Sequence, residues 1–429
     1  MSIAPTVFVE PSEALPIVSV GVNFRSGAAH DPEGKDGLAR VTARMFRRGA
    51  QGYSAEHIEE TVDALGGELA ADVGVSSSGV HFEVIRRSLD PMTDLVSTLL
   101  ARPTFDEAEL ARLLREAESE LIEARDNDRG LVSRAFRRTL FDGHPYGRRS
   151  AGKISTLRSI TQADVRAFYE RHYTRANALV IVSGDVTLAE GHALADRLLA
   201  GLPDGEPIAD SVPEPPRRPG RHLVFVDKPD RSQMQMVIGG LGTDAHDADH
   251  FPLVVACTAF GGTFTSRLMQ EVRAKRGWSY GASARVGFDR RRDAFTMWTA
   301  PSSADAPACL SLQIELLEAL REGGVTEEEL EFVKRYLVRS HAFDIDTARK
   351  RVHQKLEAAL YDLPEGYHAS YVPAVQGVTC EAANAAVRAR LSADDLIIGV
   401  VGTHAEIGET IAKAIPRLDS VTVTPFDLE

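Results

Sequence analysis

Cysteine is scarce in this sequence, and long apolar segments are absent. The three cysteines, Cys257, Cys309 and Cys380, lie far apart without a C-x-x-C pair, which excludes a zinc ribbon and a disulfide framework. No run of about 18 apolar residues occurs, so no membrane-spanning helix is predicted. The opening MSIAPTVFVEP lacks the basic start and apolar core of a signal peptide. We therefore expect a cytoplasmic protein, or a periplasmic one if a leader has been removed.

Motifs of several common enzyme classes are also missing. The glycine pair in AFGGTFTSR, residues 259–267, fits neither G-x-x-x-x-G-K-[ST] nor G-x-G-x-x-G, which argues against a nucleotide site. No G-x-S-x-G elbow is present, so a Ser/His/Asp site is not indicated. The formal net charge of −13 disfavours nonspecific binding to nucleic acid.

The length of 429 residues allows two or more domains, and a connector divides the chain. Residues 203–222, PDGEPIADSVPEPPRRPGRH, contain six prolines and several charges, a composition typical of a stiff, solvated linker. We therefore predict an N-terminal domain over residues 1–202 and a C-terminal domain over residues 223–429. The prolines favour a jointed, open arrangement of these domains in the chain alone.

The two halves repeat the same order of predicted elements. The first half is predicted to contain strands at 17–25, 75–85 and 177–186, and helices at 37–46, 54–65, 90–101 and 111–124. The second half is predicted to contain strands at 233–241, 279–288, 293–300 and 396–403, and helices at 251–262, 264–277, 308–323 and 331–343. RPTFDEAELARLLREAESEL, residues 102–121, matches EGGVTEEELEFVKRYLVRS, residues 322–340, because both have a Thr-led start and an acidic first turn. Strands in hairpin-like pairs and helices in runs indicate an α+β fold with two similar domains.

The helix predicted at GLARVTARMF, residues 37–46, carries two different stripes. Leu38, Val41 and Met45 recur at i, i+3 and i+7, which is typical of a helix face that packs on a core. The second stripe carries permanent positive charge and comprises Arg40, Arg44, Arg47 and Arg48. A helix beside a core strand therefore presents arginines on its other face.

Three segments carry a resemblance to a known family. They are SGAAHDPEGKDGLARVTARMF (26–46), HPYGRRSAGKISTLRSITQADVRAFYERHYTRANALVIVSGDV (144–186) and GGTFTSRLMQEVRAKRGWSYGASA (261–284). Together they resemble the pitrilysin/insulinase family of zinc peptidases, the inverzincins, whose motif H-x-x-E-H follows a Gly-Leu pair in the first segment. The resemblance covers nearly the whole chain. It implies two homologous domains, each a mostly antiparallel sheet covered by helices on one side, in a clamshell arrangement.

The zinc motif of that family is absent from this chain. By the resemblance, Arg40 and Arg44 stand in place of the two His ligands, and Ala43 in place of the general-base Glu. The downstream Glu ligand corresponds to Glu120. A guanidinium stays protonated and offers no lone pair, whereas zinc needs neutral imidazole or anionic ligands. This half is therefore expected to bind no catalytic zinc.

The arginines allow three interpretations. Our hypothesis is that Arg40 or Arg44 pairs with Glu116 or Glu120, so that an ion pair replaces the zinc link between two helices. The alternatives are solvated arginines and a basic stripe for nucleic acid, although the stripe lacks interleaved aromatics. Elsewhere, the two histidines of HDADH, residues 246–250, could chelate a metal if helical. That segment precedes a helix, so a polar loop is favoured.

A second candidate site lies in EVRAKRGWSYG, residues 271–281. Arg273 stands seven residues before Tyr280, with Gly277 ending a helix before the next strand begins. This spacing matches the Arg/Tyr pair that the family contributes from its C-terminal domain. A phenol is a neutral donor at pH 7 that could hold an oxyanion, and an arginine could grip peptide carbonyls. The alternative is an ordinary strand Tyr and an ordinary helix-end Arg.

The resemblance then implies one half of a divided peptidase, inactive alone and without a cofactor of its own. A homologous partner with an intact H-x-x-E-H would supply zinc, water and base in a heterodimer, while Arg273 and Tyr280 would act on an unfolded peptide. In the family such a peptide joins a sheet edge. The alternatives are a structural or scaffolding homologue with no part in hydrolysis and a homodimeric peptide-binding protein. No nucleic-acid partner is expected.

Overall fold

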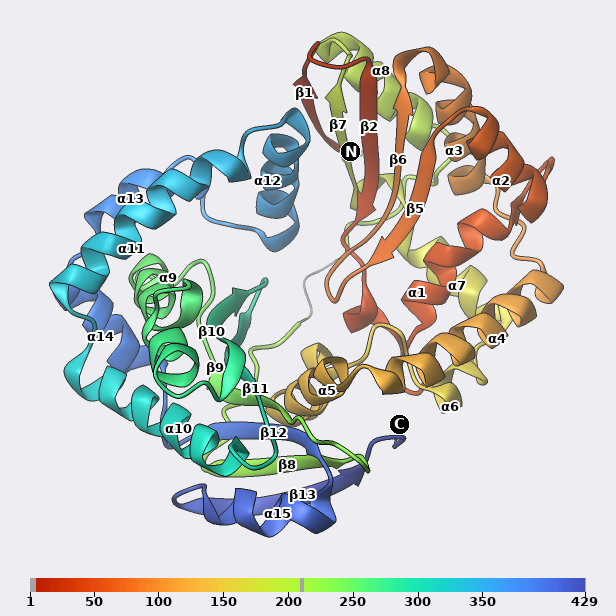
Figure 1. Ribbon diagram of the computed structural model, residues 1–429. Coiled ribbons are helices and arrows are strands. Elements are labelled where there is room, and N and C mark those ends of the chain that lie inside the picture. Colours follow the sequence, from red (N-terminus) through yellow and green to blue (C-terminus); the bar gives the residue numbers. More distant parts are fainter. Residues whose placement is uncertain (1–4, 209–211, 429) are drawn as a thin grey trace.

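The computed structural model describes residues 5–208 and 212–428, which form two sheets with their helices (Figure 1). The N-terminal half contains β1 (Thr6–Pro11), β2 (Ile17–Phe24), η1 (Ala28–His30), α1 (Leu38–Met45), η2 (Phe46–Arg48), β3 (Gly49–Ala50), β4 (Tyr53–Ser54), α2 (Ala55–Ala64), β5 (Glu68–Val73), β6 (Ser78–Ile85), η3 (Arg86–Ser88), α3 (Leu89–Ala101), α4 (Glu107–Glu123), η4 (Ala124–Asp126), α5 (Asp128–Leu140), η5 (Pro145–Gly147), α6 (Ile154–Leu157), α7 (Gln162–His172), η6 (Arg175–Asn177), β7 (Ala178–Gly184) and α8 (Leu188–Leu199).

The C-terminal half contains β8 (Arg221–Asp227), β9 (Gln235–Leu241), α9 (His250–Cys257), η7 (Thr258–Gly262), η8 (Met269–Ala274), β10 (Ser279–Phe288), β11 (Arg292–Pro301), α10 (Ala306–Gly323), α11 (Glu327–Ser340), η9 (His341–Asp344), α12 (Ala348–Tyr361), α13 (Tyr371–Gly377), α14 (Cys380–Arg390), β12 (Leu396–Gly402), α15 (His404–Lys413) and β13 (Leu418–Pro425).

The two sheets repeat one topology. Their strand orders are β1-β7-β2-β6-β5 and β10-β11-β9-β12-β8-β13, so β5 corresponds to β10, β2 to β9 and β7 to β12. Strand β13 is an addition at the far edge of the second sheet. Three of the four neighbouring pairs in the first sheet and three of the five in the second are antiparallel. The predicted α+β fold with two similar, mostly antiparallel sheets is confirmed.

Each sheet buries one face under helices of its own half, and the strand residues alternate between two cores. In β7, Val180 and Val182 join the large N-terminal core, whereas Leu179 and Ile181 point to the opposite face. Successive side chains of a strand lie on opposite faces of the sheet, so a strand of near-continuous apolar sequence can be covered twice. The N-terminal sheet is therefore covered on both faces.

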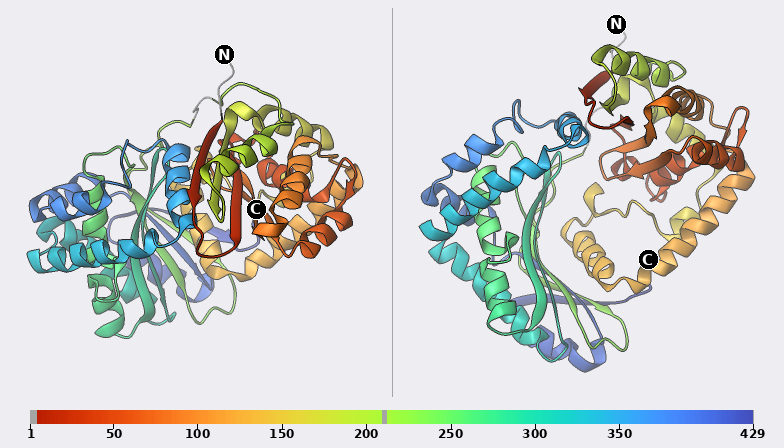
Figure 2. Two further views of the ribbon diagram at one scale, coloured as in Figure 1. Left: turned by 90° about the horizontal axis from the view of Figure 1, so that it is seen from above. Right: turned by 45° about the horizontal axis from the view of Figure 1, so that its top comes forward.

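The second cover on each sheet is a helix from the other half, as Figure 2 shows. Helix α12 packs on β7 and β1 of the N-terminal sheet, and α5 packs on β12, β9 and β8 of the C-terminal sheet. Ion pairs across this junction join Arg351 of α12 to Glu10 of β1 at 2.7 Å, and Arg137 of α5 to Asp293 of β11 at 2.8 Å. This exchange of helices links the two arms of the clamshell beyond the connector itself.

The end of the connector is tied to both halves. Its residues 209–211 lie outside the described part of the chain. Arg217 pairs with Asp395 at 2.5 Å, Arg218 donates to the carbonyl oxygen of Thr139 at 3.0 Å, and β8 already begins at Arg221. Among the residues that the structure describes, no helix combines the length and the apolar character needed to cross a bilayer.

Candidate functional site

Helix α1 has the two stripes predicted from its sequence. Leu38, Val41 and Met45 are buried in the N-terminal core, and the arginines lie on the opposite side. The helix begins after Gly37, whose φ of 100° suits glycine. The carboxylate of Asp31 accepts hydrogen bonds from the backbone N–H groups of Gly37 and Ala39, both at 2.7 Å. Burial raises the pKa of Asp31 to about 7, because these two hydrogen bonds offset only part of the lost hydration.

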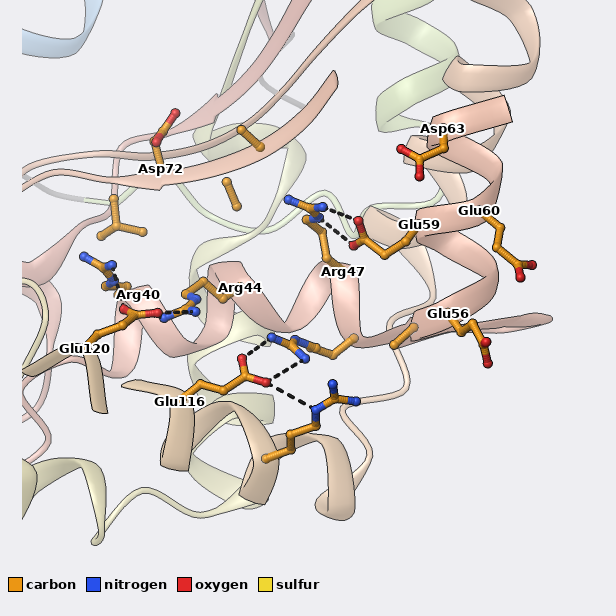
Figure 3. A pocket seen from close by; sticks show the side chains of 16 residues that line it. Arg40, Arg44, Arg47, Glu56, Glu59, Glu60, Asp63, Asp72, Glu116 and Glu120 are labelled. Carbon is orange, nitrogen blue, oxygen red and sulfur yellow. Dashed lines mark hydrogen bonds and ion pairs between the residues drawn. The ribbon is translucent and has the colours of Figure 1, made fainter. Parts of the chain in front are cut away.

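Arg40 and Arg44 share one carboxylate, that of Glu120 on α4 (Figure 3). Nη2 of Arg44 lies 2.7 Å from Oε1 of Glu120 and Nη1 lies 3.0 Å from Oε2, while Nη2 of Arg40 lies 3.3 Å from Oε2. Glu116, one turn earlier on α4, pairs instead with Arg48. The predicted ion pair between the two helices is therefore present at Glu120, whereas Glu116 pairs with Arg48 and Arg112 and with neither predicted arginine.

This donor set does not fit zinc. The positions of the two family His ligands hold guanidinium groups, which have no lone pair to offer a metal. Both oxygens of Glu120 already accept hydrogen bonds from these permanent cations. Within residues 5–208 and 212–428, no group of three or more His, Cys, Asp or Glu side chains is arranged to hold a metal.

Side chains of the HDADH segment also contact other residues of the same chain. His250 begins α9 and its Nε2 lies 2.8 Å from the hydroxyl of Tyr367, while His246 lies on the exposed loop before the helix. Asp247 and Asp249 both pair with Arg390, each at 2.8 Å. The two histidines therefore serve different environments, as the polar-loop interpretation expects.

The arginines line a groove of about 1150 Å³ between α1, α2, α4 and β5. Its acidic lining residues are Glu56, Glu59, Glu60, Asp63, Asp72, Glu116 and Glu120. Glu59 forms a two-point ion pair with Arg47, at 3.1 and 2.5 Å, so each labelled arginine in Figure 3 faces a carboxylate. One wall is β5, the edge strand of its sheet. An edge strand beside a groove has the geometry that can accept an extended peptide.

Tyr280 is displayed by an irregularity in β10. The pairing of β10 with β11 shifts register between Ser279 and Ala282, so Tyr280 and Gly281 lie in a bulge of an edge strand. The Ser279 hydroxyl fixes this bulge, because it donates to the carbonyl oxygen of Gly281 at 2.6 Å and accepts from the N–H of Ala300 at 3.0 Å. Bulges redirect side chains and are common beside active sites. The Tyr280 side chain is 84% exposed.

Arg273 lies between two exposed aromatic rings. Its Cζ is 4.4 Å from the ring centre of Tyr280 and 4.7 Å from that of Phe264, a residue that is 67% exposed. In the described part of the chain, this guanidinium forms no ion pair. The segments η7 and η8 lie before and after Phe264, and η8 contains Arg273. Both segments are π-helical, a form that is frequent at functional sites. The predicted Arg/Tyr pair is thus in contact, and Phe264 was not predicted.

Two protein-family models match this chain. Residues 6–153 match the family model described as "Insulinase (Peptidase family M16)", and residues 159–337 match the one described as "Peptidase M16 inactive domain". The chain belongs to the M16 peptidase family. The resemblance noted from the sequence is confirmed.

Bacterial M16 relatives are similar at the level of sequence. An "Uncharacterized zinc protease" of Rickettsia bellii is 26% identical over 265 residues, which span 61% of this chain and 63% of that protein. A protein of Mycobacterium tuberculosis with the same description is 27% identical over 402 residues, 89% of this chain and 88% of the relative. The "Non-peptidase homolog YmxG" of Helicobacter pylori is 19% identical over 397 residues, 92% and 91% of the two chains.

Solved structures share the M16 fold. A peptidase M16 inactive domain from Pseudomonas fluorescens has a TM-score of 0.86 at 24% identity and covers 93% of this chain and 95% of its own. The periplasmic protease PqqL of Escherichia coli has a TM-score of 0.77 at 16% identity, over 97% of this chain and 50% of PqqL. A chain of complex III2 from Candida albicans has a TM-score of 0.75 at 12% identity, over 95% and 97%.

Within the M16 family this chain is of the inactive type. Positions 40, 43 and 44 hold Arg, Ala and Arg, so the H-x-x-E-H residues are missing from α1. The inactive-domain match and the name of YmxG agree with a non-catalytic homologue.

Proposed function

We propose that this M16 chain is the non-zinc subunit of a two-chain zinc metallopeptidase. The observation that carries the proposal is the contrast between its two candidate sites. The metal position on α1 has been converted to ion pairs, whereas Tyr280 and Arg273 remain exposed and in contact. A purely structural subunit has no need of a bulged, exposed tyrosine packed on an arginine that lacks a carboxylate partner within the described residues.

In this proposal the residues of the C-terminal half act on the peptide carbonyl. A phenol hydroxyl is protonated at neutral pH and donates to the carbonyl oxygen as it becomes an oxyanion, an interaction whose loss costs about 10²–10³ in rate. The five N–H donors of Arg273 serve neighbouring peptide carbonyls, because cation–π contacts with Phe264 and Tyr280 leave those donors available. Zinc, its water and the general base belong to a homologous partner with an intact H-x-x-E-H.

The comparisons with PqqL support a paired arrangement. This chain covers 97% of its own length but only 50% of PqqL, and it covers 96% of the first half of PqqL alone. A protein described as a periplasmic protease is therefore twice the length of this fold. Two separate M16 chains of this length, bound to each other, would together equal the length of PqqL.

A second candidate function is structural. It is favoured by the fold shared with a chain of complex III2 and by the non-peptidase description of YmxG. In that case the Arg273–Tyr280 contact would be an ordinary surface feature, and hydrolysis would not depend on it.

The experiment that separates the two is Tyr280→Phe in a reconstituted pair. The chain is mixed with an M16 subunit from the same genome that carries H-x-x-E-H, and cleavage of an internally quenched peptide is followed. We expect kcat to fall by about 10²–10³ with unchanged assembly in sedimentation. The control is Tyr336→Phe, which changes another exposed tyrosine, on α11. Full activity of Tyr280→Phe would favour the structural function.

A further inference from the structure

A second cavity, of about 630 Å³, lies where the two halves meet. The N-terminal half supplies α5 and the segment 142–153, and the C-terminal half supplies Val226 of β8 and Phe426 after β13. Sites for small molecules commonly have volumes of about 300–1,000 Å³ and occur at domain junctions. This cavity has the size and the position of such a site, and the Arg273–Tyr280 contact forms no part of it.

The lining of this cavity is basic although the whole chain carries a net charge of −13. Six lining residues carry positive charge: Arg134, Arg137, Arg138, Arg148, Arg149 and Lys153. Three carry negative charge: Glu33, Asp36 and Asp142. An excess of cations gathered at one concave place in an acidic protein favours an anionic occupant.

Two of these arginines have only carbonyl acceptors among the described residues. Nη2 of Arg134 donates to the carbonyl oxygen of Ala124 at 3.3 Å, and Nη1 of Arg148 donates to that of Asp31 at 2.5 Å. The carboxylate of Asp31 accepts hydrogen bonds from the backbone N–H groups at the start of α1, and it attracts Arg148 electrostatically without a hydrogen bond to its guanidinium. A guanidinium has five N–H donors, so most donors of both side chains are left for a ligand. Partial burial also lowers the pKa of Arg134, which marks a cation without a compensating carboxylate.

Part of the remaining wall of the cavity is apolar. Leu131 and Val226 are largely buried behind this wall, and Phe426 and Leu428 present exposed apolar surface from the C-terminal side. A small inorganic ion would gain nothing from this wall, whereas an aromatic or aliphatic group would lose water-exposed surface against it. The cationic side chains and the apolar wall together favour a ligand that has both an anionic group and an apolar part.

We propose that this cavity binds an organic anion with an apolar body and a single anionic head group. The head group is recognised by the guanidinium groups of Arg134 and Arg148, and the body packs on Phe426 and Leu428. A planar fork of N–H donors suits a carboxylate, sulfonate or phosphate equally, so the head-group class is an oxyanion.

Two matched dyes test the proposal with the full chain alone. The anionic probe is 8-anilinonaphthalene-1-sulfonate, and the neutral probe is N-phenyl-1-naphthylamine, which lacks only the sulfonate. We expect the sulfonate to bind one-to-one and at least about 10-fold more tightly than the neutral dye, since a desolvated charge-assisted contact is worth about 1.5–3 kcal/mol. The doubly substituted Arg134→Met/Arg148→Met chain should lose this preference and bind both dyes alike.

Two further variants keep the test decisive. Phe426→Ala should weaken both dyes to a similar extent, because it removes apolar wall and no charge. Arg115→Met, on the exposed face of α4, should leave both affinities unchanged. Far-UV circular dichroism and the melting temperature establish that each variant is folded. Sulfonate affinity that survives in the doubly substituted chain would overturn the proposal, as would equal affinity of the parent chain for the two dyes.

Discussion

Arg44 and Glu120 form a two-point ion pair that joins α1 to α4, with N–O distances of 2.7 and 3.0 Å. The pairing continues in opposite directions along the two segments, because Arg48, in η2 directly after α1, meets Glu116, one turn earlier on α4. The contact therefore fixes the register of two antiparallel helices at the positions to which the resemblance assigns the zinc ligands of the family.

Replacing Arg44 by Met should lower the free energy of unfolding by about 0.5–1 kcal/mol. The value is modest because the side chains are 23% and 44% exposed and Arg40 still faces Glu120. Urea unfolding of Arg44→Met, Glu120→Gln and the double variant gives the coupling free energy of the pair. Arg115→Met is the control for loss of a surface arginine on α4. A coupling of zero would contradict a stabilising role.

The same place should accept zinc once its ligands are restored. In Arg40→His/Arg44→His, two imidazoles at i and i+4 and the carboxylate of Glu120 provide three acceptable ligands. We expect one zinc ion per chain by calorimetry at pH 7.5, with affinity lost below about pH 6 as the imidazoles protonate. Adding Glu120→Gln should weaken binding. Failure of the double variant to bind zinc would mean that α1 and α4 no longer frame a metal position.

Phe264 should act as a positioning residue for Arg273. Removing its ring in Phe264→Ala should lower kcat/KM of the reconstituted pair by about 2- to 5-fold, the value of one exposed cation–π contact. Phe264→Trp, which keeps a ring face for the guanidinium, should restore activity, and Phe332→Ala on α11 serves as the control for an exposed Phe. Loss of activity that Trp does not restore would indicate a different role.

His172 should make the protein less stable in acid. Burial, together with nearby positive groups, lowers the pKa of this imidazole to about 3, and its Nδ1 has no hydrogen-bond partner among the residues that the structure describes. Between about pH 6.5 and pH 3, His172 is therefore protonated in the unfolded chain but neutral in the folded chain. The stability present above pH 6.5 is lost progressively as the pH falls, by at most about 2 kcal/mol at pH 5.

Urea unfolding at pH 5 and pH 8 checks this pH dependence. In His172→Phe, which keeps the contact with the Phe168 ring at 4.2 Å in the parent, the free energy of unfolding at pH 8 minus that at pH 5 should be lower by up to about 2 kcal/mol than in the parent. Asp31, whose raised pKa acts in the opposite direction, contributes equally to both chains. His192→Phe on the exposed side of α8 is the matched control. An undiminished difference in His172→Phe would show that other groups cause the acid sensitivity.

The local elements of this fold could be read from the sequence more readily than their partners. Periodicity predicted α1 with its two stripes, and the capping pattern predicted α4 and α11. The crossing of α5 and α12 between halves was not predicted, because an apolar helix face does not reveal which sheet it will cover. Leu356 of α12, for example, packs with Ile181 of β7, far away in the chain.

The candidate site shows the same division. Spacing and resemblance predicted Arg273 with Tyr280 and placed Glu120 beside the arginines. The choice between Glu116 and Glu120 could not be made, since the two lie one turn apart on the same face of α4. The bulge that displays Tyr280 depends on strand register. Phe264 was predicted as the first residue of a helix over 264–277, but it lies in a turn before η8 begins at Met269, so its contact with Arg273 could not be foreseen.

The central claim is that hydrolysis needs two different M16 chains, and a titration tests it most directly. A fixed amount of the zinc-binding subunit is mixed with increasing amounts of this chain, and cleavage of a quenched peptide is recorded with the metal content of each chain alone. We predict no cleavage and no stoichiometric zinc for this chain alone, and activity that rises to saturation at one chain per zinc-binding subunit. Peptide cleavage by this chain alone, with one tightly bound zinc ion, would contradict the account.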